Sequence, residues 1–389
     1  MAGQTITRRQ FFKVGAGTCV ALMAPKLIGC GEATHPSTTT VYAVLGDELS
    51  ALYEMAKQAA TQLGITGSSM TGATVFIKPN FCTMGLDILG TPYDPLVGEC
   101  TKPEIVAAVA EQCLAAGAAK VTIGEGAHVT EWDWSTVTFV PGNSIEGATD
   151  LKAAADRLQT LYPAATIELV CLNQANEWTG LPSSSGDPLL ADGIPVATRL
   201  CDADHVISCP VVKSHLYAAV SLAMKNYVGA VSMMGDHAAR CKLHQAYAHA
   251  TCHGVAEAGV SGSYVDIHQW RRDQGKQDFA IVDCSIGLEG GGPTRPPTHH
   301  GSTIDIKSRN AASKYFLLAG DDLAAVDSMT AQLMGFTVAE LKQMALLDAL
   351  GYTSIHDVVL SGASVDEIAI RDWLKPTLES EDFFFQYCT

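Results

Sequence analysis

The sequence predicts an α/β fold, in which a mixed or mostly parallel sheet is flanked by helices and carries inserted loops. Two observations support this class. Short apolar strands alternate with amphipathic helices, and Ala73 to Lys78, Pro103 to Ala116 and Lys120 to Gly124 follow one another as strand, helix and strand. This order is typical of a right-handed parallel unit. The length of 389 residues accommodates such a unit as one body or as two lobes.

Local sequence signals predict each helix, strand and loop. Gly64 ends a helix expected over 47–64, while Pro103 and Gly117 stand at the first turn and the C-cap of the next helix. Further strands are expected at 167–172, 205–209, 278–284, 315–319 and 357–360, and further helices at 150–161, 322–334 and 338–350. Loops are expected at 127–150, 176–193, 210–215, 287–293 and 294–313.

The first 29 residues read as a twin-arginine signal peptide. Arg8 and Arg9 precede an apolar run from Val14 to Met23, which is shorter than the roughly 20 residues that a membrane span needs. Leu27-Ile28-Gly29-Cys30 resembles a lipobox, so Cys30 is expected to be lipidated; the alternative is a secreted chain cleaved nearby. We expect a bacterial or archaeal protein in the periplasm or on the outer face of the cell membrane. The twin-arginine translocase would export it, and only the signal or lipid anchor would touch the membrane.

The expected division of the chain follows from this leader. Residues 1–29 are the signal peptide, 30–46 a tether, 47–375 the α/β domain and 376–389 a C-terminal tail.

The charge balance is strongly acidic. The chain has 25 Lys and Arg against 41 Asp and Glu, a net charge of −16. The first 29 residues hold four basic residues and no acidic ones, so their removal would bring the net charge to −20. Such a surface repels phosphate backbones, and nucleic acid is therefore not expected as a partner.

Twelve cysteines contain no C-x-x-C pair, so neither a ferredoxin-type iron–sulfur cluster nor a zinc ribbon is expected. An oxidising compartment permits disulfides, and Cys82–Cys100 and Cys241–Cys252 are conceivable pairs. Other cysteines, such as Cys113 in an alanine-rich helix, are expected to be buried small hydrophobes.

Polar residues gather where four predicted strands end, which is where α/β proteins place their ligands. The clusters are Lys78-Pro79-Asn80; Gly124-Glu125-Gly126-Ala127-His128; Lys213-Ser214-His215 with Lys225-Asn226; and Asp283 to Glu289-Gly290-Gly291-Gly292-Pro293. Each cluster alone also fits a structural role, such as a strand-end lysine or a wide glycine turn. Together they predict one site.

The roles expected in this site follow from residue chemistry. Lys78, Lys213 and Lys225 would form a cationic pocket for a carboxylate or phosphate, with Asn80, Asn226 and the backbone of Gly290 and Gly291 beside it. His215 or His244 would be the general base or a metal ligand, with Glu289 or Glu125 as the acid partner. His237 is a further candidate metal ligand. On a helix His249 and His253 would share one face, as metal ligands can, although a solvated polar helix with scattered histidines is the favoured explanation.

These clusters make the chain resemble the bacterial and archaeal family known as domain of unknown function 362. The matching segments are Ile77-Lys78-Pro79-Asn80, Thr101-Lys102-Pro103-Glu104, Ile123-Gly124-Glu125-Gly126, Asp202-Ala203-Asp204, Pro210 to His215, Met224-Lys225-Asn226 with Gly229, His244, Ile281-Val282-Asp283, Glu289 to Pro293, and Ala319-Gly320-Asp321 to Val326-Asp327. The resemblance covers about 73 to 352 and implies a fold and a site rather than a reaction. Many relatives carry an iron–sulfur module that this chain lacks.

A second resemblance is to the nickel-pincer lactate racemases. Asp204-x-Val206-Ile207, His215 and Lys225 match their spacing, with Ser221 between the last two. In that family the histidine and lysine hold a nickel cofactor, and His237 or His244 would supply the last ligand. The chain departs from the pattern because Leu222-Ala223 replaces a Gly-Gly pair, which puts close approach of a flat cofactor in doubt.

Two functions remain from the sequence. The first is an exported envelope enzyme acting on a small carboxylate, as a racemase, isomerase or redox enzyme, with a nickel-pincer-type or other metal cofactor loaded before export. The second is a non-catalytic envelope lipoprotein that binds a small anion, or a metal through the histidine-rich segment 236–253.

Overall fold

The computed structural model describes residues 38–82, 93–126, 132–174, 177–232, 238–296 and 299–381. From residue 38 onward the chain belongs to one unit rather than two lobes. None of the described helices is long and apolar enough to cross a membrane.

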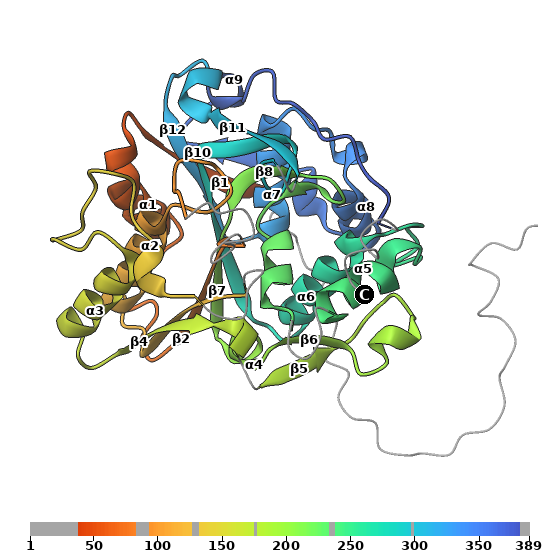
Figure 1. The fold of residues 1–389 in the computed structure, drawn as a ribbon, viewed down its shortest axis with the longest axis horizontal. Helices are drawn as coiled ribbons and strands as arrows, with labels where there is room; N and C mark the ends of the chain where they lie inside the picture. The colour runs from red at the N-terminus through yellow and green to blue at the C-terminus, as the bar shows by residue number, and fades with distance from the viewer. Residues whose placement is uncertain are drawn as a thin grey trace, which may run out of the picture. The chain divides into compact units, whose positions relative to one another are not determined.

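Eleven strands of the described chain join in one sheet (Figure 1). Its main path runs β13 (Val358–Ser361), β1 (Thr39–Gly46), β12 (Tyr315–Gly320), β10 (Gln277–Gly291), β7 (His205–Cys209), β2 (Thr74–Pro79), β3 (Lys120–Glu125) and β4 (Thr166–Cys171). Along this path β12 is antiparallel to both of its neighbours, while the other adjacent pairs are parallel. The carboxyl ends of β2, β3, β7 and β10 therefore meet at one edge of the sheet.

Three further strands extend the sheet at that edge. After Pro210, the strand β8 (Val211–His215) pairs with the second half of β10 and with β9 (Ala219–Ser221), and β11 (His300–Asp305) pairs with the end of β10. A separate hairpin consists of β5 (Trp178–Leu181) and β6 (Ile194–Ala197).

Helices cover both faces of the sheet (Figure 1). One face is covered by α1 (Leu52–Gln62), α2 (Pro103–Ala115) and α3 (Leu151–Leu161), and the other by α6 (Val260–Asp273), α7 (Leu323–Leu333) and α8 (Lys342–Ala349). The shorter helices are α4 (Thr198–Asp202), α5 (Ala238–Ala248) and α9 (Val365–Ile368). Because side chains alternate along a strand, Ile281 and Leu317 enter the core under α1 to α3, while Val282 and Phe316 enter the opposite core. The predicted α/β class, with a mostly parallel sheet between helices, is confirmed.

Several expected loops are strands. The loop expected at 210–215 contains β8, the glycine-rich run after Ile286 continues β10 to Gly291, and the loop expected at 294–313 contains β11. These segments are strands because they pair with one another in the sheet, which their residue types alone do not indicate. A side chain at Gly287 would place its Cβ 2.6 Å from the Val212 carbonyl oxygen, so glycine is what allows β8 to approach β10.

Two expected boundaries also differ from the structure. The end of the tether expected over 30–46 is β1, which is hydrogen-bonded between β12 and β13. The loop expected at 176–193 contains β5.

Gly98 provides a test of the packing at this edge. Its φ is +75°, and a Cβ there would lie 2.0 Å from the Gly287 carbonyl oxygen. We expect Gly98→Ala to lower the free energy of unfolding by about 3 kcal/mol, measured by urea denaturation, because it adds a backbone clash to an unfavourable φ. Gly254→Ala is the control, since φ is +84° with nothing within 4 Å, and should cost about 1 kcal/mol. Equal losses in the two variants would contradict this packing.

Candidate active site

A buried ion pair joins the carboxyl ends of β2 and β3. Lys78 Nζ donates to Glu125 Oε1 at 2.6 Å, and the two side chains are 1% and 2% exposed. The Glu125 carboxylate also accepts the backbone N–H groups of Phe81 at 2.6 Å and Gly126 at 2.7 Å. Glu125, expected as an acid partner in catalysis, is therefore engaged in holding the strand ends together.

The segment η7 (Lys225–Ala230) lies over this ion pair. Asn226 Nδ2 donates to the Lys78 carbonyl at 2.6 Å and to Ser208 Oγ at 3.1 Å, and its Oδ1 lies 3.4 Å from Lys78 Nζ. A Cβ on Gly229 would fall 2.7 Å from Glu125 Oε1 and 2.8 Å from Lys78 Nζ, so only glycine leaves room for the pair. Lys78, Glu125 and Asn226, predicted from separate strand ends, thus meet in one network.

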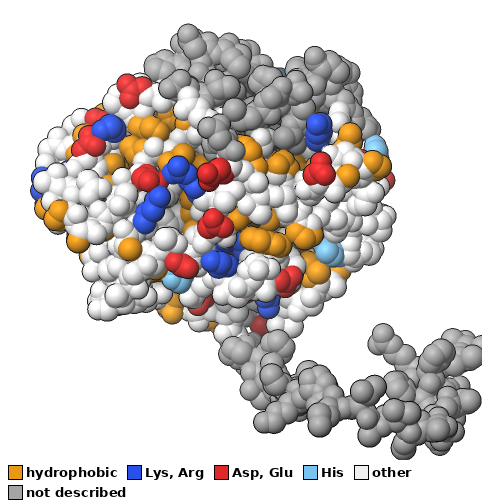
Figure 2. Space-filling model, turned by 90° about the horizontal axis from the view of Figure 1, so that it is seen from below, with side chains coloured by type: hydrophobic (Ala, Val, Ile, Leu, Met, Phe, Trp, Pro, Cys, Tyr) orange, Lys and Arg blue, Asp and Glu red, His pale blue; other side chains and the backbone are white. Residues whose placement is uncertain are grey.

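Lys213 on β8 is a second buried cation, 1% exposed. Its ammonium donates to Asn80 Oδ1 at 3.2 Å, to Cys82 Sγ at 3.2 Å and to the Glu99 carbonyl at 2.9 Å. Within the described chain no carboxylate forms an ion pair with Lys213. Basic and acidic side chains lie side by side on the surface shown in Figure 2, whereas Lys213 is buried beside neutral groups, an arrangement that favours a bound anion. From the sequence, Cys82 is considered only as a possible disulfide partner of Cys100, and its contact with Lys213 is not predicted.

His215 lies two residues after Lys213, on the same face of β8. Its Nδ1 accepts the backbone N–H groups of Tyr217 at 3.1 Å and Ala218 at 3.4 Å. Burial, and next the charges of Lys225, His244, Lys213 and His299, hold the pKa of His215 well below its usual range. The ring is therefore neutral near pH 7, and with Nδ1 accepting, its proton is assigned to Nε2, which is a donor.

In His244, on α5, Nδ1 has the opposite hydrogen-bonding role to Nδ1 of His215. Its ring is buried, and Nδ1 lies 3.0 Å from Glu381 Oε2. A carboxylate only accepts, so the Nδ1 proton of His244 is assigned to this bond, and in the neutral ring Nε2 is then the acceptor nitrogen. The Tyr217 ring contacts both histidines, with centroid distances of 5.8 Å to His215 and 5.6 Å to His244. Two buried imidazoles with opposite hydrogen-bonding roles thus lie close to one aromatic ring.

Asp327 on α7 fixes the chain before Lys225. Its carboxylate is fully buried and accepts the N–H groups of Ala223 at 2.7 Å and Met224 at 3.2 Å. Burial raises the pKa of Asp327 to about 7, and the two backbone hydrogen bonds oppose this rise. The contact sets the start of η7, from which the charge of Lys225 acts on His215.

The glycine-rich end of β10 contacts a different part of the structure. It includes Glu289, Gly290 and Gly291. Glu289 accepts from Arg309 Nη2 at 2.9 Å and from the Leu374 N–H at 2.8 Å, while the Gly290 N–H donates to the Leu374 carbonyl at 2.7 Å. Gly291 pairs with His300 on β11. These contacts tie the glycine run to the C-terminal segment and to β11, and the carboxylate in contact with His244 is Glu381 rather than Glu289.

The shared helical face expected for His249 and His253 is wrong. Helix α5 ends at Ala248, and His253 lies beyond it in a turn with φ of +50°. His253 Nε2 instead lies 2.9 Å from Asp266 Oδ1. His128 and His237 lie outside the described residues.

Neither of the two disulfides that the sequence permits is formed. Cys82 and Cys252 are both thiols, which excludes Cys82–Cys100 and Cys241–Cys252. Cys241 itself is disulfide-bonded. Cys113 is fully buried, as predicted, and burial raises the pKa of its thiol to about 12.

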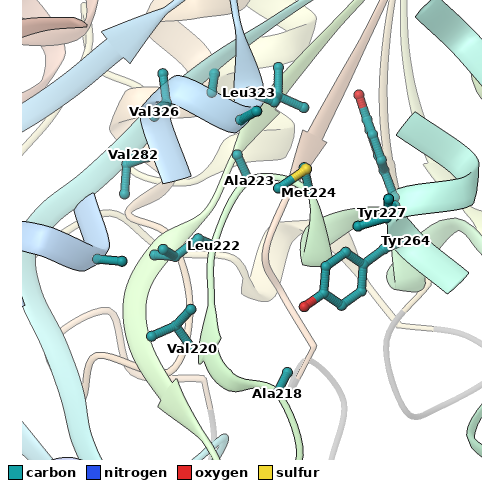
Figure 3. Packing of buried hydrophobic residues seen from close by; sticks show 14 of the residues in the cluster. Ala218, Val220, Leu222, Ala223, Met224, Tyr227, Tyr264, Val282, Leu323 and Val326 are labelled. Atoms are coloured by element: carbon teal, nitrogen blue, oxygen red, sulfur yellow. The ribbon is translucent and has the colours of Figure 1, made fainter. Parts of the chain in front are cut away.

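The described residues do not fit a flat nickel cofactor lying over the segment before Lys225. Leu222 and Ala223 are fully buried, and Figure 3 shows them among Val282, Leu323 and Val326 of the core. Among the described residues, no group of three or more His, Cys, Asp and Glu side chains could hold a metal ion.

Comparisons with known proteins identify the family. The model of the family described as "Domain of unknown function (DUF362)" matches residues 75–332, so the chain belongs to this family, as the sequence resemblance predicted. No curated protein matches the chain.

Two solved structures are similar to the chain at a low level. A Thermotoga maritima protein has 11% identity and a TM-score of 0.34, over 67% of this chain and 55% of that one. The lactate racemase apoprotein from Thermoanaerobacterium thermosaccharolyticum has 12% identity and a TM-score of 0.32, over 62% and 50%. The chain thus spans about half the length of each.

The low pKa of His215 can be measured directly. We expect His215 in the wild type to stay neutral in an NMR titration down to well below pH 6.5, because burial and nearby cations disfavour the imidazolium. Lys225→Met removes one of these cations and should raise the pKa of His215. Lys342→Met, at an exposed lysine bonded to the Glu257 carbonyl, should leave it unchanged. A His215 that titrates at its ordinary pKa in the wild type would refute this environment.

Proposed function

We propose that this protein is a racemase-like enzyme that binds a small carboxylate, such as a 2-hydroxy acid, and moves a proton at the carbon next to the carboxylate. The observation that carries the proposal is the pair of buried imidazoles beside Tyr217, one with a donor Nε2–H and one with an acceptor Nε2. Lys213 and Lys225 add positive charge around His215. A negatively charged substrate suits this environment, whereas a cationic substrate would be repelled.

The chemistry follows from these two rings. His244 Nε2 accepts the proton from the α-carbon, and the C–H electron pair moves into the carboxylate to form an enediolate. His215 Nε2–H donates to the developing oxyanion, and the lysine charges stabilise it, which is the usual way enzymes lower such a barrier. The His244 imidazolium can return its proton to the same face of the carbon, which restores the substrate. Alternatively, a solvent water gives a proton to the opposite face, the His244 imidazolium neutralises the hydroxide that remains, and the product is the enantiomer.

Exchange of the α-hydrogen with solvent tests this function. In D2O, the full-length protein should remove the α-proton NMR signal of at least one member of a panel of D- and L-lactate, malate and tartrate. His215→Asn and His244→Asn should each slow exchange by about 100-fold or more, the usual contribution of a general acid or base.

His356→Asn is the matched control, because His356 pairs with Asp348 on the exposed surface and should keep the wild-type rate. Binding of the panel without any exchange would contradict the enzyme and favour the alternative, an envelope protein that only binds a small anion.

We further propose that the protein is exported through the twin-arginine pathway and anchored by a lipid at Cys30; these residues lie outside the described part of the chain. Arg8→Lys with Arg9→Lys should leave the protein in the cytoplasmic fraction of its host, because the pathway reads the arginine pair. Cys30→Ser should still be exported but should move from the membrane to the soluble envelope fraction. Unchanged fractionation of both variants would disprove this route.

A further inference from the structure

The C-terminal segment from Trp373 to Glu381 lies across the elements that carry the two histidines. Trp373 Nε1 donates to Ser214 Oγ at 3.0 Å, next to His215 on β8. Further along, the Glu379 N–H donates to the Leu216 carbonyl at 3.0 Å. The segment then reaches α5 and α6 through Glu381, so a part of the chain expected as a tail contributes to the site.

Glu381 is held by both of its oxygens. Oε2 lies 3.0 Å from His244 Nδ1, and Oε1 accepts the N–H of Val260 at the start of α6 at 2.8 Å. Its side chain is 9% exposed. Gly259 makes this possible, since a Cβ there would lie 2.2 Å from Glu381 Oε1. The carboxylate therefore has one orientation toward the imidazole.

We propose that Glu381 is a positioning residue that fixes the tautomer of His244, with the proton on Nδ1 and the acceptor at Nε2; the catalytic consequence rests on the proposed function. A carboxylate in contact with one ring nitrogen requires the proton on that nitrogen, which leaves the other nitrogen able to take a proton. Without this contact the proton is shared between the two nitrogens. The C-terminal segment thereby determines whether His244 is a base.

The substitution Glu381→Gln tests whether this carboxylate fixes the tautomer of His244. The Val260 N–H needs an acceptor, so the amide oxygen should occupy the place of Oε1 and the NH2 group should face His244 Nδ1. That NH2 is a donor and would move the ring proton to Nε2. The substitution is thus expected to invert the tautomer while preserving shape. Glu381→Asp, which retains the carboxylate, should restore Nδ1–H at least in part.

The experiment measures the tautomer and the turnover separately in the full-length protein. In ¹⁵N-histidine-labelled protein, the His244 proton should be on Nδ1 in the wild type and on Nε2 in Glu381→Gln. For the α-hydrogen exchange of the 2-hydroxy acid panel, kcat should fall by about 100-fold, while KM should change little. Glu379→Gln, on the same segment, is the control and should match the wild type in both measurements.

The outcomes separate this inference from the proposed function. A wild-type His244 protonated on Nε2, or a Glu381→Gln variant with an unchanged tautomer, would overturn the positioning role whatever the turnover. An inverted tautomer with wild-type turnover would also overturn it. The expected tautomers in a protein that exchanges no 2-hydroxy acid would support the Glu381 contact and contradict the proposed function instead.

Discussion

The ion pair between Lys78 and Glu125 is the interaction on which the geometry of the candidate site depends. A buried ion pair is stable only when the remaining hydrogen-bonding groups of both partners are also satisfied. Removal of one partner lowers the free energy of unfolding by about 3–5 kcal/mol. Here the Phe81 and Gly126 N–H groups, the Pro79 carbonyl and Asn226 supply those bonds. The pair thus fixes the ends of β2 and β3 and the position of η7 at once.

The convergence of these residues was predictable from the sequence, because it follows from local signals. Apolar runs identify β2 and β3, and parallel strands bring the residues after them to one edge. Lys78, Glu125 and Asn226 were expected together for this reason. The prediction of β8 and β11 failed because their strand conformation comes from pairing with β10, and residue types alone do not indicate which remote segment supplies a partner.

The carboxylate partner of a histidine was harder still to predict. Glu289 and Glu125 stood in recognisable clusters, yet Glu289 contacts Arg309 and the backbone of Leu374, while Glu381 contacts His244. Glu381 has no motif around it, and Asp327 acts on a segment far away in sequence. Such contacts depend on how the chain packs after its elements have formed. The two histidines likewise differ through their neighbours, since backbone N–H groups surround His215 Nδ1 and a carboxylate faces His244 Nδ1.

The contact between Glu381 and His244 has a consequence for folding. It joins residues 137 apart in the sequence, whereas the ion pair between Lys78 and Glu125 joins residues 47 apart. Closing a longer loop costs more chain entropy, so the ends of β2 and β3 can be fixed before the imidazole of His244 receives its carboxylate. The orientation of that ring is thus among the later features of the fold to be established.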